Sequence, residues 1–323
     1  MKISTEKLEN EAEATGFRPD VLEKAALLLG LLDALRSHPF LKGKLVLKGG
    51  TALNLFVFNV PRLSVDIDLN YVGAEDRETM LAERPKIEQA FQAVFARENF
   101  SIRRMPHEHA GGKWSLQYES ASGQTGNLEV DVNFMFRVPL WPVITCDSHP
   151  VGAWRAKGIP VLDHHELAAG KLAALLARRQ ARDLFDGSRI LRRDNLDPHR
   201  LRIAFVVYGA MNRKDWRTVS IEDVDLDAAE LARQLIPTLR VRAIEDQGSP
   251  AEYGVQLIED CRKALSVVLP FTDAEREFLD LLLDKGEIDS RILTADTALQ
   301  QRIQCQPLLE WKALNVRRHK GLT

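Results

Sequence analysis

Two aspartates separated by one residue form the strongest chemical signal in this chain of 323 residues. They are Asp66 and Asp68, inside the run from Ser64 to Asn70, where polar and apolar residues alternate as in a half-buried strand. Side chains two apart on a strand point to the same face, so the two carboxylates lie side by side. Their repulsion favours a hard divalent cation, Mg²⁺ or Mn²⁺, between them. An ordinary acidic strand facing solvent is the alternative.

A glycine pair upstream offers a way to bring a phosphate to these carboxylates. The short apolar run from Lys44 to Lys48 predicts a strand, and a helix-like segment covers 52–58. Between them stand Gly49, Gly50 and Thr51. Glycine lets the backbone approach a phosphate closely, and the N–H groups at a helix start point toward it. A plain tight turn is the other interpretation of the same residues.

A later strand, predicted over 127–136, supplies a third carboxylate, for which Glu129 and Asp131 compete. Three acidic groups on adjacent strands, with a glycine phosphate loop in front, are typical of metal-dependent phosphoryl transfer, in which metal ions clamp the attacking and leaving oxygens. Ser64 stands two residues before Asp66, on the same predicted strand face, where its hydroxyl could position a triphosphate. A serine at a strand entry that bonds to the backbone is the alternative.

A long helical pattern over 164–193 carries a cluster of basic residues. At 100° per residue one stripe contains Lys171, Arg178, Arg182 and Asp186. Lys171 and Arg182 would stand about 16 Å apart on a continuous helix, a distance comparable with a nucleoside triphosphate. We therefore expect Lys171 to contact phosphates and the arginines to meet the base or the acceptor. A surface helix held by pairs such as Arg182 with Asp186 is the alternative.

Composition excludes several classes of protein. With 45% apolar and 28% charged residues, the chain is expected to be globular. No apolar run approaches the roughly 20 residues of a membrane helix, and the N-terminus is polar, so we expect a cytoplasmic protein. The net charge of −2 indicates no general attraction to nucleic acid. Affinity for RNA would depend on local basic clusters, one between Arg178 and Arg193 and one between Lys312 and Lys320.

Two stretches together resemble a known family. The run from Lys48 to Leu53 (KGGTAL) and the run from Arg62 to Leu69 (RLSVDIDL) resemble the signature of the AbiEii/AbiGii toxins, nucleotidyltransferase-like proteins that include the mycobacterial MenT toxins. About a hundred residues later, Glu166 to Leu175 and Arg182 to Asp186 match the family pattern of a helix that ends in R-D-x-x-D. The resemblance therefore covers separate parts of the chain.

This resemblance implies roles for individual residues. Gly49 and Gly50 would bind phosphate, Asp66 and Asp68 would bind metal, and Asp131 would be the third carboxylate. We expect catalysis by these three aspartates with Lys171. The expected nucleotide-binding residues are Gly49, Gly50, Thr51, Ser64, Lys171, Arg178, Arg182 and Asp186.

The implied function is that of the toxin of a toxin–antitoxin pair active in phage defence. It would transfer a nucleotide from a nucleoside triphosphate to an acceptor, expected to be RNA such as a tRNA 3′ end, and an antitoxin protein is a possible partner. Two alternatives stay open: a nucleotidyltransferase acting on a small molecule or a protein, and a non-catalytic module that binds RNA or a partner.

The expected fold is α/β. We predict an N-terminal nucleotidyltransferase domain like that of polymerase β over residues 1–194, with a mixed sheet flanked by helices. Residues 195–323 read as helical almost throughout, which predicts an all-helical C-terminal domain.

Overall fold

The computed structural model describes residues 2–106, 111–193, 196–242 and 249–321. Contacts group the chain into two units. Unit 1 comprises Met1–Arg137, Val143–Leu162 and Ile236–Gly248; unit 2 comprises Val138–Pro142, Asp163–Leu235 and Ser249–Thr323. The boundary expected from the sequence, after residue 194, falls on residues 194–195, which lie outside the described residues. In the division by contacts, the segment Asp163–Leu235 already belongs to unit 2, as does the shorter segment Val138–Pro142.

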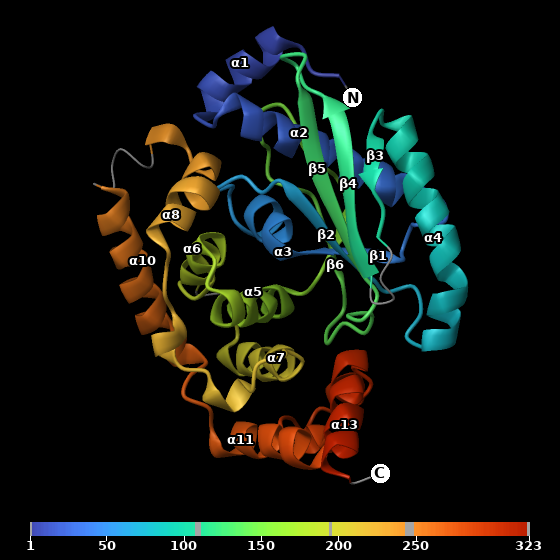
Figure 1. Cartoon of the computed structure of the whole chain (residues 1–323), viewed down its shortest axis with the longest axis vertical. Coiled ribbons are helices and arrows are strands. Elements are labelled where there is room, and N and C mark those ends of the chain that lie inside the picture. The colour runs from blue at the N-terminus through green and yellow to red at the C-terminus, as the bar shows by residue number, and fades with distance from the viewer. Residues whose placement is uncertain (1, 107–110, 194–195, 243–248, 322–323) are drawn as a thin grey trace. The chain divides into compact units, whose positions relative to one another are not determined.

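Unit 1 is built on one mixed sheet of seven strands in the order β3-β4-β5-β2-β1-β7-β6 (Figure 1). The strands are β1 (Leu45–Lys48), β2 (Asp66–Tyr71), β3 (Ser101–Arg104), β4 (Gly111–Glu119), β5 (Thr125–Asn133), β6 (Ile144–Cys146) and β7 (Ile159–Val161). Strand β2 runs antiparallel to β1 and parallel to β5. The prediction of a mixed sheet is confirmed. The short strands β3, β6 and β7 were not predicted, because three or four residues show too little alternation.

Helices of unit 1 cover the apolar face of this sheet. They are α2 (Pro19–Ser37), which contacts β2, β5 and β7, and α4 (Arg77–Arg97), while α1 (Thr5–Thr15) packs on α2. Phe91 and Phe95 of α4 pack against Trp114 of β4, with ring centroids 6.2 and 5.6 Å apart. Because strand side chains alternate between faces, this packing assigns the polar residues of β2, β4 and β5 to the opposite face.

The glycine pair joins β1 to a short helical segment. Helix α3 (Gly49–Thr51) begins directly at the first glycine and continues into the π-helical turn η1 (Ala52–Val57). The strand, turn and helix predicted for this region are present, with the helix starting three residues earlier than the apolar pattern indicates.

The described part of unit 2 contains helices and turns and no strand. Its longer helices are α5 (His164–Arg178), α6 (Ala181–Ile190), α7 (Pro198–Ala210), α10 (Pro250–Ala264), α11 (Asp273–Asp280), α12 (Thr297–Gln304) and α13 (Pro307–Lys320). Shorter helical turns include α8 (Ala228–Glu230). No helix in the described ranges has the length and apolar character needed to span a membrane.

The continuous helix expected over 164–193 is wrong, because the chain breaks between α5 and α6. Arg179 ends α5 in the left-handed conformation, with φ of 54°, and its N–H donates to the carbonyl of Leu175. Helix α6 then packs against α5, and Gly187 permits close approach: a Cβ there would lie 3.2 Å from Leu175. Neither glycine nor proline stands at the break, so the local sequence carries no stop signal.

A buried glutamate holds the short segment Val138–Pro142 to the rest of unit 2. Glu166 of α5 accepts the backbone N–H groups of Leu140 and Trp141 at 3.0 and 3.2 Å. It also accepts the hydroxyl of Tyr208, at 2.9 Å. Burial raises the pKa of Glu166 to about 7, although these three donors oppose the shift.

Candidate functional site

The polar face of the sheet in unit 1 places the two predicted acidic strands side by side. On the parallel strands β2 and β5, Asp68 is the register partner of Asp131. Asp68 also pairs with Lys48 of β1, and Asp131 with Lys113 of β4. These four residues form what we call the first row: a lysine, two aspartates and a lysine across four strands. Paired residues on neighbouring strands point to the same face, so the row places a cation on each side of the two carboxylates.

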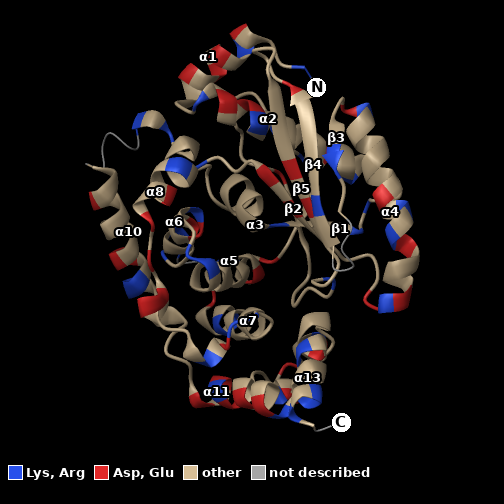
Figure 2. Cartoon of the chain, in the orientation of Figure 1, with Lys and Arg blue, Asp and Glu red and all other residues tan. Residues whose placement is uncertain are grey.

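A second row runs beside the first. Its members, in strand order from β2 to β3, are Asp66, Glu129, Ser115 and Arg104. Figure 2 shows the acidic positions on β2 and β5 within the sheet of unit 1. The register therefore brings Asp66, Asp68 and Asp131 onto adjoining strands of one face, as the alternating pattern indicates. Ser64 was expected to lie on the same strand as the two aspartates. Strand β2 instead begins at Asp66, and Ser64 is buried just before it.

The glycine turn lies against the first row. Gly49 has φ of +72°, and a Cβ on it would stand 2.2 Å from Oδ2 of Asp68. This position therefore requires glycine for both its backbone conformation and its proximity to the carboxylate. The hydroxyl of Thr51 donates to the backbone carbonyl of Asp66 at 2.5 Å, and the side chain of Asn54 donates to the carbonyl of Gly50 at 2.9 Å. The first bond fixes the turn to β2, and the second ties the turn to the helical segment that follows it.

The acidic residues of the two rows have different charged neighbours. Burial raises the pKa of Asp131, the charge of Asp68 raises it further, and Lys48 and Lys113 oppose the shift. The ammonium of Lys113 forms an ion pair with Glu129, 2.8 Å from Oε2. That hydrogen bond, together with the charges of nearby aspartates, raises the pKa of Lys113. Glu129 is thus already neutralised, whereas Asp131 and Asp68 face each other. The sequence pattern did not identify Lys48 or Lys113 as site residues, because their closeness to the aspartates depends on how strands distant in the chain pair.

The carboxylates of the two rows do not by themselves form a complete metal-binding site. Among the described residues, no group of three or more acidic, histidine or cysteine side chains is arranged so that it could hold a metal ion by itself. A site that binds Mg²⁺ through one or two carboxylates and completes its shell with substrate oxygens needs no such group.

The second cluster of expected site residues lies in unit 2, between α5 and α6. The ammonium of Lys171 stands 2.8 Å from Asp183 and 3.0 Å from Asp186. Arg178 contacts Asp183 through two nitrogens, at 2.6 and 3.1 Å. Lys171 and both aspartates are buried. Burial would raise the pKa of Asp183, but Lys171 and Arg178 outweigh it and lower that pKa.

The break between α5 and α6 gives these residues different neighbours from those on the expected continuous helix. Such a helix would keep Lys171 and Asp186 apart along its axis, whereas the break at Arg179 brings them into contact. Arg179 contacts Asp223, and Asp183 is bound by Lys171 and Arg178. Arg182 lies in the first turn of α6, next to Asp183 in sequence.

The two basic clusters expected to bind RNA are partly engaged in contacts within unit 2. Arg192 forms an ion pair with Asp260, and Lys320 with Asp284. Lys312 donates to the carbonyl of Asn212 at 2.5 Å. The separation of about 16 Å between Lys171 and Arg182 that a continuous helix would give does not apply, because Arg182 lies on α6 beyond the break.

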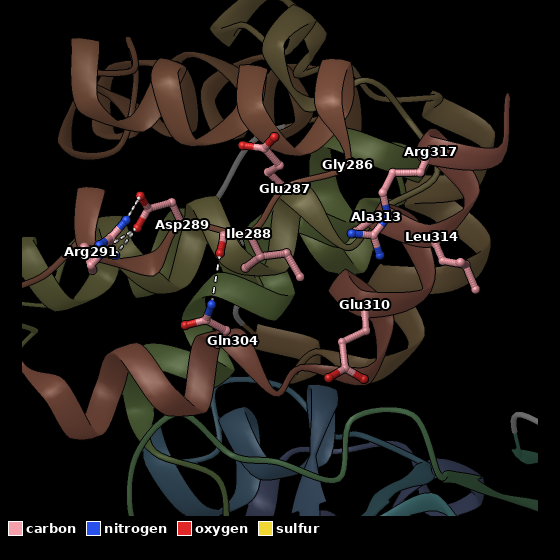
Figure 3. A pocket seen from close by; sticks show the side chains of 10 residues that line it. All are labelled: Gly286, Glu287, Ile288, Asp289, Arg291, Gln304, Glu310, Ala313, Leu314 and Arg317. Carbon is pink, nitrogen blue, oxygen red and sulfur yellow. Dashed lines mark hydrogen bonds and ion pairs between the residues drawn. The ribbon is translucent and has the colours of Figure 1, made fainter. Parts of the chain in front are cut away.

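Unit 2 also contains an open pocket of about 720 Å³ near its C-terminal helices (Figure 3). Glu287, Glu310 and Arg317 contribute charges to its lining, and Arg291 is bound there by Asp289 at 2.7 Å. The excess of carboxylates disfavours a triphosphate. None of the residues expected from the sequence to form the site lines this pocket.

Comparison with known proteins identifies the class of enzyme. The family model described as the nucleotidyl transferase AbiEii toxin of type IV toxin–antitoxin systems matches residues 30–256. The chain belongs to the AbiEii family. The AbiEii match spans both stretches on which the resemblance rested, and the chain is therefore a toxin-type nucleotidyltransferase.

The solved structures support the same fold. MenT4, a nucleotidyltransferase toxin from Mycobacterium tuberculosis H37Rv, superposes with a TM-score of 0.58 at 17% sequence identity. The alignment covers 95% of this chain and 99% of MenT4. At this identity the similarity shows that the chain has the fold of MenT4. No curated protein matches the sequence.

Proposed function

We propose that this AbiEii nucleotidyltransferase uses Mg²⁺ or Mn²⁺ to transfer a nucleotidyl group from a nucleoside triphosphate to RNA, such as a tRNA 3′ end. Growth arrest by this reaction would make it the toxin of a pair, with an antitoxin protein as its partner. A tRNA acceptor would place the reaction in the cytoplasm. The observation that carries the proposal is the pairing of Asp68 with Asp131 beside the Gly49 turn.

The donor set of the first row suits a hard divalent cation. Asp68 and Asp131 face each other across neighbouring strands, and Asp68 contributes to the raised pKa of Asp131. A cation held by these two, with Asp66 beside them, would relieve that repulsion. The remaining ligands would be triphosphate oxygens. When bound, such an ion withdraws charge from the phosphates and stabilises the leaving group.

Transfer exchanges one phosphorus–oxygen bond for another. The oxygen of the acceptor hydroxyl attacks the α-phosphorus, and the bond from that phosphorus to the bridging oxygen breaks. Pyrophosphate leaves with the electron pair. The hydroxyl proton passes to the carboxylate of Asp131 and then to solvent. The turn at Gly49 and Gly50 would lie against the phosphates.

For the cluster in unit 2 we propose a role in triphosphate binding. Lys171 and Arg178 are cations on α5, held by Asp183 and Asp186. The aspartates fix the lysine in one position, which lowers the entropic cost of presenting it to an anion. Arg182 and Asp186 stay nucleotide-binding candidates through their place on α6. Thr51 stays a candidate through its hydrogen bond to the carbonyl of Asp66, and Ser64 through its place two residues before Asp66.

The test is transfer of label from each of the four triphosphates, with total RNA as acceptor. We expect α-³²P label, and not γ-³²P label, to enter RNA in the presence of Mg²⁺, and expect chelation or the double variant D66A/D68A to abolish it. Label in RNA from the γ position would show phosphoryl transfer instead. Label confined to protein or to small molecules would exclude RNA as the acceptor, and absence of any label would favour a binding module.

A further inference from the structure

We propose that the outer part of the polar sheet face binds the single-stranded end of the acceptor RNA. The residues are Lys113, Ser115 and Arg104, which we call the acceptor strip. The inference rests on the proposed function, since it assigns the surface along which the RNA reaches the carboxylates.

The strip begins at the carboxylates and ends at the edge of the sheet. Lys113 is the register partner of Asp131, and Ser115 is the partner of Glu129. Arg104 of β3 pairs with Ser115, beyond a shift in register after Ile102. Strands are about 4.8 Å apart, so Arg104 lies roughly 14 Å from Asp66, three strand spacings away. A chain lying across these strands would pass from the edge strand to the aspartates.

Charge on this face changes sign along that path. The aspartates and Glu129 repel phosphates, and the cations on the β4 and β3 side are Lys113 and Arg104. Lys113 is about half exposed, and its ammonium is held by Glu129, 2.8 Å away. A phosphate oxygen can take the place of that carboxylate, because both are anionic acceptors. Arg104 is exposed and forms no ion pair with another residue in the part of the chain that the structure describes.

The chemistry of the strip favours a single strand. Two cations and a hydroxyl along a sheet face can follow a sugar–phosphate backbone, and such contacts tolerate different sequences. In the basic clusters of unit 2, Arg192, Lys312 and Lys320 are engaged by neighbours, as Lys113 is by Glu129. Arg104 therefore offers a phosphate a cation that is not already paired with a described carboxylate.

The experiment compares R104A and R104E with a matched arginine variant in the same unit. R97A is the control, because Arg97 is exposed and lies in α4, which packs on the opposite face of the sheet. For each protein we would measure transfer into RNA against RNA concentration, against triphosphate concentration and at several salt concentrations. Melting temperatures would verify folding.

We expect R104A to raise the KM for RNA roughly five- to tenfold, and R104E to raise it further, with kcat and the KM for triphosphate unchanged. The slope of log affinity for RNA against log salt should fall by about 0.7 in R104A, one phosphate contact on a single strand. R97A should resemble the wild type.

A wild-type KM for RNA and salt slope in both Arg104 variants would overturn the acceptor strip while leaving transfer to RNA intact. An equal change in R97A would do the same, since it would reveal a general effect of surface charge. Wild-type label found in protein or small molecules, and not in RNA, would overturn the strip together with the proposed acceptor.

Discussion

Asp68 and Asp131 are register partners on adjacent parallel strands, so their carboxylates share one face of the sheet. We predict that D68A and D131A abolish transfer, because each removes half of the pair that would hold the cation. E129A is the control from β5, the strand that carries Asp131. Glu129 already forms an ion pair with Lys113, so the E129A variant should retain most of its activity.

The free energy of unfolding of D68A should stay within about 0.5 kcal/mol of wild type or rise, since a repulsion is removed. The pKa of Asp131, measured by NMR, should fall in D68A, because Asp68 contributes to raising it. D66A is expected to lose transfer as D68A does. Near-normal turnover in either variant would show that the site is assigned to the wrong residues.

Gly49 provides a second prediction. In G49A the new Cβ would stand 2.2 Å from Oδ2 of Asp68, so the carboxylate or the turn must move. We expect loss of transfer and a destabilisation of about 1–2 kcal/mol or more from the left-handed backbone alone. Gly43 is a matched control, with φ of +76° and no described atom within 4 Å of the place its Cβ would take. G43A should share the backbone penalty, measured by urea unfolding, and keep its activity; equal activity in both variants would contradict the prediction.

The buried ion pairs of Lys171 predict a large effect on stability. K171A would leave Asp183 and Asp186 buried without their shared lysine, which costs about 3–5 kcal/mol for a buried pair. Urea unfolding measures this loss. The triple variant K171M/D183N/D186N removes the buried charges together and should recover much of the stability. Its transfer activity should stay low if Lys171 also binds triphosphate, whereas recovery of full activity would leave Lys171 a purely structural role.

Glu166 predicts a dependence of stability on pH. Its pKa is about 7 when folded against 4.5 ordinarily, so between these values the folded state retains a proton that the unfolded state has lost. The free energy of unfolding should therefore fall as pH rises from about 4.5 to about 7, by at most roughly 3 kcal/mol. The charged and titratable groups that act on it are Asp163 and Tyr208.

E166Q cannot lose a proton and should flatten this part of the stability curve, while the hydroxyl of Tyr208 can still donate to the amide oxygen. Unfolding at pH 5 and at pH 8 measures the difference. The same loss of stability with rising pH in E166Q and in wild type would assign the effect to other groups.

The local sequence around the carboxylates was sufficient to predict their strand and their shared face. Alternation in the run that contains Asp66 and Asp68 has a period of two, and that period alone decides which side chains lie together. The glycine pair after an apolar run similarly indicated a strand, a turn and a helix start, and the structure has all three. These features depend on residues close in the chain, which is why sequence patterns identify them.

Only the tertiary structure decided which residues from distant segments meet. Lys48 and Lys113 flank the aspartates through pairing of β1 with β2 and of β4 with β5, and no local pattern encodes strand order. The break at Arg179 depends on packing of α6 against α5 and on the buried bonds from Lys171 to Asp183 and Asp186. Helical periodicity continues across that break, so the sequence by itself predicted one helix, and long-range contacts outweighed it.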